Sequence, residues 1–239
     1  MKKILLIAFA VIFSGQSAFA AGLRFVAGEI PPYTYAENGK PNGAASLIVA
    51  EMARELGEPF ALEFLPWKRA QDETQQNDNV AVIPLSRNAE REALYKWVGP
   101  IIVDQEVLIT PASGKPAPKT LAEAKDWSIC TLLGSPTVSV LSQAGFTNVQ
   151  ATKDIAACAR MMNVGRVDAW SAARMVAPYQ YRLEGFDPGT LRYSVVVRPN
   201  EIYMGFSLKV PDETIARWQG ALDKLRANGK LAAILKTYE

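Results

Sequence analysis

Residues 60–83 read FALEFLPWKRAQDETQQNDNVAVI, and the order of their apolar and polar stretches decides the fold class. Residues 60–65 predict a strand. Pro66 then predicts the start of a polar helix, because the first helical turn does not need a donor from the proline nitrogen. Residues 80–83 are entirely apolar, which predicts a strand buried on both faces. Strand, helix and strand in this order predict an α/β fold with parallel strand pairing.

The same alternation continues on both sides of this stretch. Upstream, residues 23–27 predict a strand and residues 45–56 a helix that Gly57 ends. Downstream, a predicted strand at 107–110 precedes the proline- and glycine-rich break PASGKPAP at 111–118. The series after the break predicts strands at 127–132, 148–150, 167–170, 191–197 and 203–208 and helices at 137–143, 154–162, 211–226 and 230–238. The sequence therefore predicts two α/β blocks.

Composition excludes several kinds of chemistry. The chain has 239 residues, two cysteines, no histidine and a formal net charge of +2. Without histidine, a Ser-His-Asp or Cys-His catalytic arrangement and a His-ligated zinc site cannot form. Two cysteines are too few for a thiolate-held zinc ion or iron–sulfur cluster. The small net charge argues against a broad basic surface for nucleic acid. We expect no metal, no cofactor and no nucleic-acid partner.

The first twenty residues have the pattern of a secretory signal peptide. Two lysines at positions 2 and 3 precede an apolar run at 4–13 and the small-residue site AFA at 18–20. A membrane anchor is the alternative, but the run is about half the length that a membrane span requires. The signal-peptide interpretation predicts cleavage after residue 20 and a mature chain in the periplasm.

Export would place Cys130 and Cys158 in an oxidising compartment, where disulfides form and persist. A bond between them would close a loop with a sequence separation of 28. The alternative is two buried thiols, which are common in protein cores.

Several short motifs follow one another along the chain. They are EIPPY (29–33), GKPNG (39–43), LPWKRA (65–70), SRNAER (86–91), YKWVGP (95–100), GS (134–135), GRVDA (165–169) and ALDKLRANGKL (221–231). In this order they resemble the bacterial extracellular solute-binding proteins of family 3, the periplasmic binding proteins of amino-acid ABC transporters. The resemblance implies a type II periplasmic-binding-protein fold, in which two hinge strands join two lobes, each a sheet flanked by helices. It places residues 21–108 and 207–239 in the first lobe and 109–206 in the second.

The resemblance also assigns residues to a cleft that closes around a small ligand. Arg91 would pair with a ligand carboxylate, which the planar guanidinium matches with two parallel N–H donors; a surface arginine is the alternative. Ser86 and Arg87 belong to the same motif, and Arg87 is either a second anion contact or a solvated side chain. Tyr33 and Trp67 would form aromatic walls, unless both belong to the core.

Other site residues are expected around the second block. Gly134, Ser135 and Thr137 lie at a predicted strand-to-helix turn, where free backbone N–H groups attract anions; an ordinary helix cap is the alternative. Trp170 follows the GRVDA motif and lines the cleft or packs in the core. Glu29 ends the first strand and either accepts a hydrogen bond from a cationic ligand group or lies on the surface.

One departure from the family bears on the ligand. The acidic residue that usually holds the ammonium of an amino acid is replaced by Ala173, and Arg174 follows it. Arg91 and Arg174 together would suit a carboxylate-bearing or otherwise anionic small molecule, such as an amino acid or a related organic acid.

The expected function is capture of such a molecule by a monomeric periplasmic binding protein, not an enzyme, that delivers it to an ABC importer. One alternative is a ligand-sensing subunit that acts on a membrane receptor. Another is a dehydratase-like enzyme on the same scaffold, for which Glu29 or another carboxylate would act as general acid or base.

Overall fold

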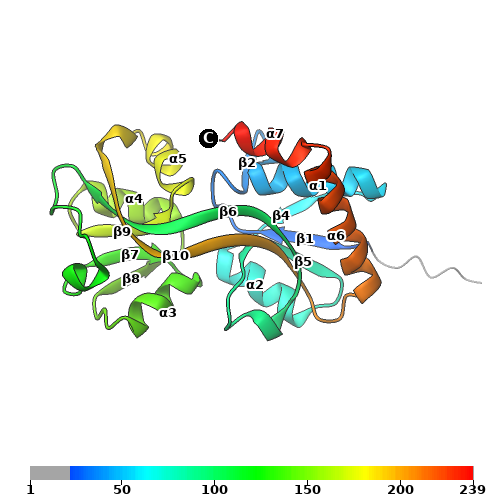
Figure 1. Ribbon diagram of the computed structural model, residues 1–239, viewed down its shortest axis with the longest axis horizontal. Coiled ribbons are helices and arrows are strands. Elements are labelled where there is room, and N and C mark those ends of the chain that lie inside the picture. Colours follow the sequence, from blue (N-terminus) through cyan, green and yellow to red (C-terminus); the bar gives the residue numbers. More distant parts are fainter. Residues whose placement is uncertain (1–21, 239) are drawn as a thin grey trace, which may run out of the picture.

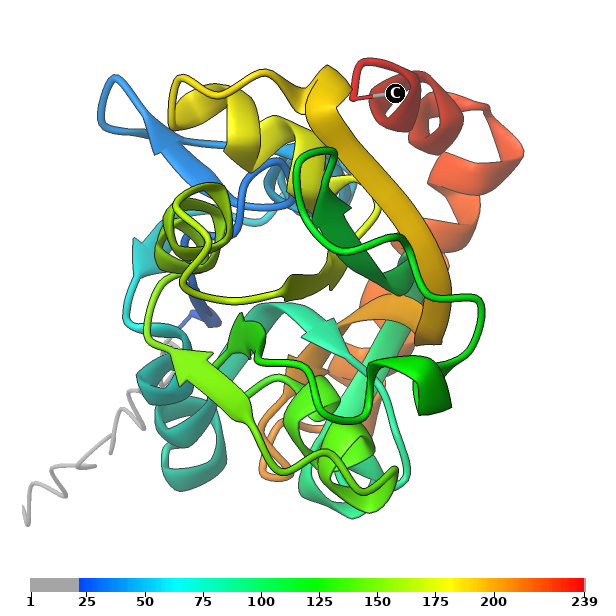
Figure 2. The same ribbon diagram turned by 90° about the vertical axis from the view of Figure 1, so that its left-hand side faces the viewer.

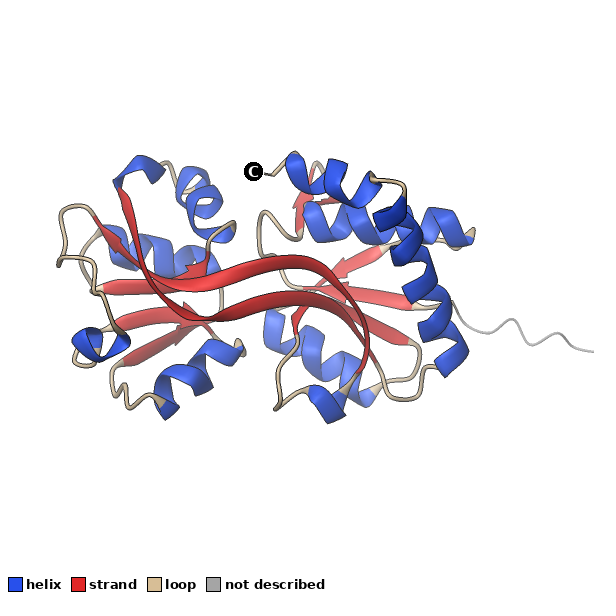
Figure 3. Cartoon of the chain, in the orientation of Figure 1, coloured by secondary structure: helices blue, strands red, loops and turns tan. Residues whose placement is uncertain are grey.

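Two antiparallel strands of 16 residues each, β6 (Lys96–Pro111) and β10 (Leu191–Phe206), run through both halves of the molecule (Figures 1 and 3). The computed structural model describes residues 22–238, so the predicted signal peptide lies outside the described residues. The two strands stand at the centre of one eight-stranded sheet with the order β4-β1-β5-β10-β6-β9-β7-β8. The expected α/β fold, with sheets flanked by helices, is confirmed.

The first half surrounds the parallel strands β1, β4 and β5; the apolar side chains of β1 and β5 are buried, and those of β4 are partly buried. Its elements are β1 (Arg24–Ala27), β2 (Tyr35–Glu37), β3 (Lys40–Asn42), α1 (Ala44–Leu56), β4 (Leu62–Phe64), α2 (Trp67–Gln76), β5 (Val80–Ser86), α6 (Asp212–Ala227) and α7 (Lys230–Lys236). Every residue of β5 is buried, as its apolar sequence predicts. The C-terminal helices α6 and α7 pack beside α1 (Figure 1).

The second half is built around β7, which pairs in parallel with β8 on one side and β9 on the other. Its elements are β7 (Ile129–Leu132), α3 (Pro136–Gln143), β8 (Val149–Thr152), α4 (Ile155–Asn163), β9 (Ala169–Ala173) and α5 (Val176–Leu183). Helices cover both faces of this part of the sheet, which is turned toward the viewer in Figure 2. None of the helices within residues 22–238 is long and apolar enough to cross a membrane.

The structure differs from the sequence prediction mainly in the long strands. The predicted strand at 107–110 is the end of β6, and the predicted strands at 191–197 and 203–208 are one strand, β10. Polar residues at 104–106 in β6, and at 198, 200 and 201 in β10, interrupt the apolar pattern. The strands continue there because β6 and β10 pair with each other, Glu106 opposite Arg198, and so satisfy their backbone groups. Helix α5 and the β2–β3 hairpin were not predicted.

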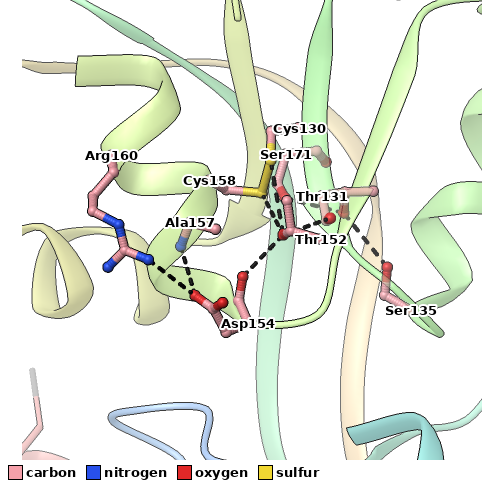
Figure 4. The surroundings of a disulfide bond; sticks show 9 residues. All are labelled: Cys130, Thr131, Ser135, Thr152, Asp154, Ala157, Cys158, Arg160 and Ser171. Atoms are coloured by element: carbon pink, nitrogen blue, oxygen red, sulfur yellow. Dashed lines mark hydrogen bonds and ion pairs between the residues drawn. A yellow bond between two sulfur atoms is a disulfide. The ribbon is translucent and has the colours of Figure 1, made fainter. Parts of the chain in front are cut away.

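A disulfide joins Cys130 on β7 to Cys158 on α4, with their Cα atoms 5.4 Å apart and both residues buried (Figure 4). The Thr152 hydroxyl lies 3.2 Å from the Cys158 sulfur and donates to the carbonyl of Asp154. The Asp154 carboxylate caps α4 by accepting from the backbone N–H of Ala157. The bond therefore holds the first turns of α4 against the sheet.

Candidate functional site

A small cavity of about 60 Å³ lies where the two halves meet, and both halves and both long strands contribute to its wall. The apolar lining residues are Ile30, Trp67, Pro84, Leu132, Pro136, Ile155, Ala172, Ala173, Val176 and Ile202. The polar lining residues are Tyr33, Ser86, Arg91, Glu106, Ser135, Ser171, Arg198 and Asn200.

Arg91 reaches the cavity from the turn that follows β5. The side chain of Asn88 shapes this turn by accepting a hydrogen bond from the Arg91 backbone N–H. The Arg91 guanidinium is buried and donates to the carbonyl of Ser86 at 3.0 Å and to the side-chain oxygen of Gln71 at 2.9 Å. Burial lowers the pKa of Arg91 to about 10, and Arg198 adds to the lowering while Tyr95 opposes it. At neutral pH the guanidinium therefore remains charged.

Arg91 also contacts the opposite half of the molecule. Its guanidinium donates to the carbonyl of Gly134 at 2.5 Å, and Gln71 donates to the same oxygen at 3.3 Å. Gly134 has φ +79, a left-handed conformation that suits glycine and turns the chain from β7 toward α3. The partners of Arg91 are all neutral oxygens: within residues 22–238, no carboxylate lies at ion-pair distance from it.

A second polar cluster comes from the centre of the long strands. Arg198 on β10 lies 3.5 Å from the Glu106 carboxylate on β6 and donates to the hydroxyl of Ser86 and the side-chain oxygen of Asn200. The Ser86 hydroxyl donates to that same Asn200 oxygen. Burial raises the pKa of Glu106, and the charge of Arg198 opposes the rise; burial lowers the pKa of Arg198, and Glu106 opposes that. The two charged groups stabilise each other inside the cavity.

Some lining groups have unused hydrogen-bonding capacity. Within the described part of the chain, the Ser171 hydroxyl and the Nε–H of Arg198 are buried without a partner. Buried polar groups are nearly always paired, so such groups beside a cavity point to a ligand. Figure 4 shows Ser171 and Ser135 beside Thr131, whose hydroxyl donates to the Ser171 carbonyl.

The sequence profile of the bacterial extracellular solute-binding proteins, family 3, matches residues 25–239. The chain belongs to this family. No curated protein matches it in sequence. The family name describes extracellular proteins that bind solutes.

Three solved structures illustrate the likeness. A histidine kinase sensor domain with similarity to periplasmic binding proteins has a TM-score of 0.81 at 17% identity, covering 90% of this chain and 95% of that one. A mutant of ArgBP from T. maritima has a TM-score of 0.80 at 16% identity, covering 91% and 95%. The GluR0 ligand-binding core from Nostoc punctiforme, in complex with L-glutamate, has a TM-score of 0.80 at 16% identity, covering 90% and 98%. At these identities the likeness shows the fold.

The two predicted aromatic wall residues both line the cavity. Trp67 begins α2 and packs over Gly28, where an added Cβ would lie 3.1 Å from the indole ring. Tyr33 presents its ring to the cavity while its hydroxyl donates to the Asp104 carboxylate on β6 at 2.6 Å. Burial and the nearby Asp104 raise the pKa of Tyr33 well above its ordinary value, so its hydroxyl stays protonated.

Four charged or aromatic residues that the sequence offers as site candidates do not line the cavity. Glu29 is exposed and borders two outer hollows beside the cavity. Arg87 forms a bidentate ion pair with Glu92 and lies over the rings of Trp97 and Tyr203. Arg174 is exposed, donates to Gln105 and lies over Tyr193, and Trp170 is fully buried in the core of the second half.

Of the three site residues predicted in the strand-to-helix turn at 134–137, one lines the cavity and two do not. Ser135 lines the cavity, but its backbone N–H donates to the carbonyl of Leu132 and is not free for an anion. Gly134 offers a carbonyl to Arg91, and Thr137 is buried behind the lining. The Ser135 N–H is used within the turn and Pro136 has no N–H. The N-terminus of α3 therefore has fewer free backbone donors for an anion than its position predicts.

Several site residues were missed from the sequence: Gln71, which holds Arg91 from outside the lining, and the lining residues Glu106, Ser171, Arg198 and Asn200. The signal that could have found three of them is polarity inside a strand. Glu106, Arg198 and Asn200 stand in stretches flanked by apolar residues, and charged side chains are rarely placed in a sheet centre unless they are paired. Ser171 carries no such signal. The described residues contain no cluster of three acidic, cysteine or histidine side chains that could hold a metal ion.

Proposed function

We propose that this chain is a periplasmic binding protein that captures a small carboxylate-bearing molecule, an amino acid or a related organic acid, and delivers it to an ABC importer. One observation carries the proposal: Arg91 is a buried cation on the cavity wall whose protein partners are neutral oxygens. A buried charge without a counter-charge costs free energy, and a ligand carboxylate would offset that cost. The Nη1 group of Arg91, whose hydrogen bond goes to the Ser86 carbonyl, has a second N–H that could donate to this carboxylate.

The arrangement of the cavity favours trapping by hinge closure. Hydrogen bonds join the two halves directly, from Arg91 and Gln71 to Gly134 and from Ser139 to Glu90. A ligand that touches both halves stabilises the closed state over an open one, so binding and closure are coupled. The predicted lobe boundaries, 108/109 and 206/207, fall at or near the ends of β6 and β10, and bending of these strands is part of the proposal.

The test is a thermal-shift screen of the mature protein after unfolding and refolding to strip bound ligand. The panel holds amino acids, dicarboxylates, aromatic acids and polyamines at about 1 mM. A micromolar ligand at this excess stabilises the folded state by about 4 kcal/mol, which raises the Tm by about 8–16 °C for a chain of this size. Recovery of the hit unchanged after incubation, checked by NMR, separates binding from catalysis.

Two variants make the screen specific for the site. Arg91→Gln should abolish the shift produced by a carboxylate, because the cation assigned to that group is removed. Arg69→Gln is the matched control: Arg69 lies on the exposed face of α2, paired with Glu73, and should leave the shift unchanged. Hits confined to cations without a carboxylate, or a shift retained by Arg91→Gln, would contradict the proposal. Loss of uptake in a strain that lacks the chain tests delivery to an importer.

A further inference from the structure

We infer that the cavity selects carboxylates that carry a carbonyl or hydroxyl group on the α-carbon, in place of the ammonium group of an α-amino acid. The class is that of 2-oxo and 2-hydroxy acids with an apolar body. The inference rests on the proposed function, because it concerns what the same cavity accepts.

The charge of the lining is the first argument. Among the described residues that line the cavity, three are charged: Arg91, Arg198 and Glu106. Their sum is one positive charge, which a monocarboxylate neutralises. A zwitterionic amino acid would leave that charge in place and would also bring an ammonium, a third cation, into a buried space with two arginines. Like charges in a low-dielectric site repel strongly.

The one lining carboxylate is already engaged. Glu106 is 7% exposed and lies opposite Arg198 in the register of the long strands, with 3.5 Å between their charged groups. An ammonium that recruited Glu106 would compete with Arg198 and leave that guanidinium buried without a counter-charge. The next carboxylate along β6, that of Asp104, accepts from the Tyr33 hydroxyl and from the backbone N–H of Met175 and does not line the cavity.

The unused hydrogen-bonding groups of the cavity are donors or hydroxyls. The Nε–H of Arg198 can only donate, and the hydroxyl of Ser171 can donate or accept. The side-chain oxygen of Asn200 already accepts from Ser86 and Arg198. A ligand carbonyl or hydroxyl oxygen can accept these free hydrogen bonds, whereas an ammonium, which has three donors and no acceptor, cannot.

The body of the ligand follows from the rest of the wall. Five aliphatic side chains line the cavity, Ile30, Leu132, Ile155, Val176 and Ile202, together with the rings of Tyr33 and Trp67. Such a wall favours a branched aliphatic or aromatic group over a polar one.

The test is isothermal titration of the stripped mature protein with matched compounds. One pair is 4-methyl-2-oxopentanoate and leucine, and the other is phenylpyruvate and phenylalanine; each pair differs only in the group at the α-carbon. We expect the oxo acid of at least one pair to bind at least tenfold more tightly than its amino acid. Equal or tighter binding of both amino acids would overturn the inference and leave the proposed function standing. If no carboxylate of either kind binds, the proposed function fails first and the inference fails with it.

Two conservative variants test the assigned roles. Ser171→Ala should weaken 4-methyl-2-oxopentanoate several-fold and leave 4-methylpentanoate, which lacks the α-oxygen, unchanged. Glu106→Gln removes the carboxylate but keeps the shape, and it should not weaken 4-methyl-2-oxopentanoate more than a few-fold. If the wild-type protein binds leucine tightly and Glu106→Gln abolishes that binding, Glu106 is an ammonium acceptor and the inference is overturned. A wild-type Tm for each unliganded variant shows that the fold is intact.

Discussion

Opening the Cys130–Cys158 bond should lower the free energy of unfolding by about 3.5 kcal/mol. The bond spans 28 residues in sequence, and both cysteines are fully buried. In the chain-entropy account, a link restricts the unfolded chain by an amount that grows with the logarithm of the loop length, and a loop of this size gives about 3.5 kcal/mol at 25 °C. For a chain of this length the change corresponds to a fall in Tm of about 7–14 °C.

The assay is urea unfolding of the mature protein with and without a phosphine reductant, followed by fluorescence. Reduction should move the midpoint to lower urea, because the free energy falls while the native contacts are kept. The double variant Cys130→Ala/Cys158→Ala is the control, since its midpoint should not respond to the reductant. It should also lie somewhat below the reduced wild type, because both sulfur atoms leave a buried site. A loss below about 1 kcal/mol on reduction would refute the loop-entropy reasoning.

Three further predictions concern other parts of the chain. Gly43→Ala should lower stability by about 1–3 kcal/mol in urea unfolding, because φ is +101 and the new Cβ would lie 2.6 Å from a backbone oxygen; an unchanged midpoint would contradict this. Ion pairs with Arg54 and Lys230 lower the pKa of Glu51 to about 2, so its contribution is present above the unfolded value near 4.5 and is lost as the pH falls toward 2. Glu51→Gln should therefore cost about 1 kcal/mol or less at pH 7 and nothing near pH 2, and a cost that persists in acid would argue for packing instead. Arg87→Gln should leave ligand affinity unchanged within threefold in titration calorimetry, because its guanidinium is held by a carboxylate outside the cavity; a large loss would return it to the site.

The parts of the fold that depend on local pattern could be predicted. The apolar stretch at 80–83 is a fully buried strand, and Gly57 ends α1 in a left-handed conformation. The helix that begins after Pro66 follows from the same local rules. Each of these depends on side chains within a few residues, which is what a sequence displays directly.

The candidate site could be predicted only in part. The motif that contains Arg91 identified a buried cavity residue, whereas the neighbouring Arg87, four positions earlier, pairs with Glu92 outside the cavity. Sequence spacing did not separate the two arginines, because the turn between them decides which one points inward. The same limit applies to Trp67, which lines the cavity, and Trp170, which is in the core.

By itself, the sequence determined the α/β class, the family and the absence of histidine chemistry, because each depends on residue type and order. Only the tertiary structure decided that the polar segments around Glu106 and Arg198 are strand rather than loop, and that they face each other inside the cavity. It alone brought Gly134 to Arg91, 43 positions apart, to join the two halves. These contacts are made between residues far apart in sequence, and their geometry comes from the packing of two halves around a pair of shared strands, which no local pattern specifies.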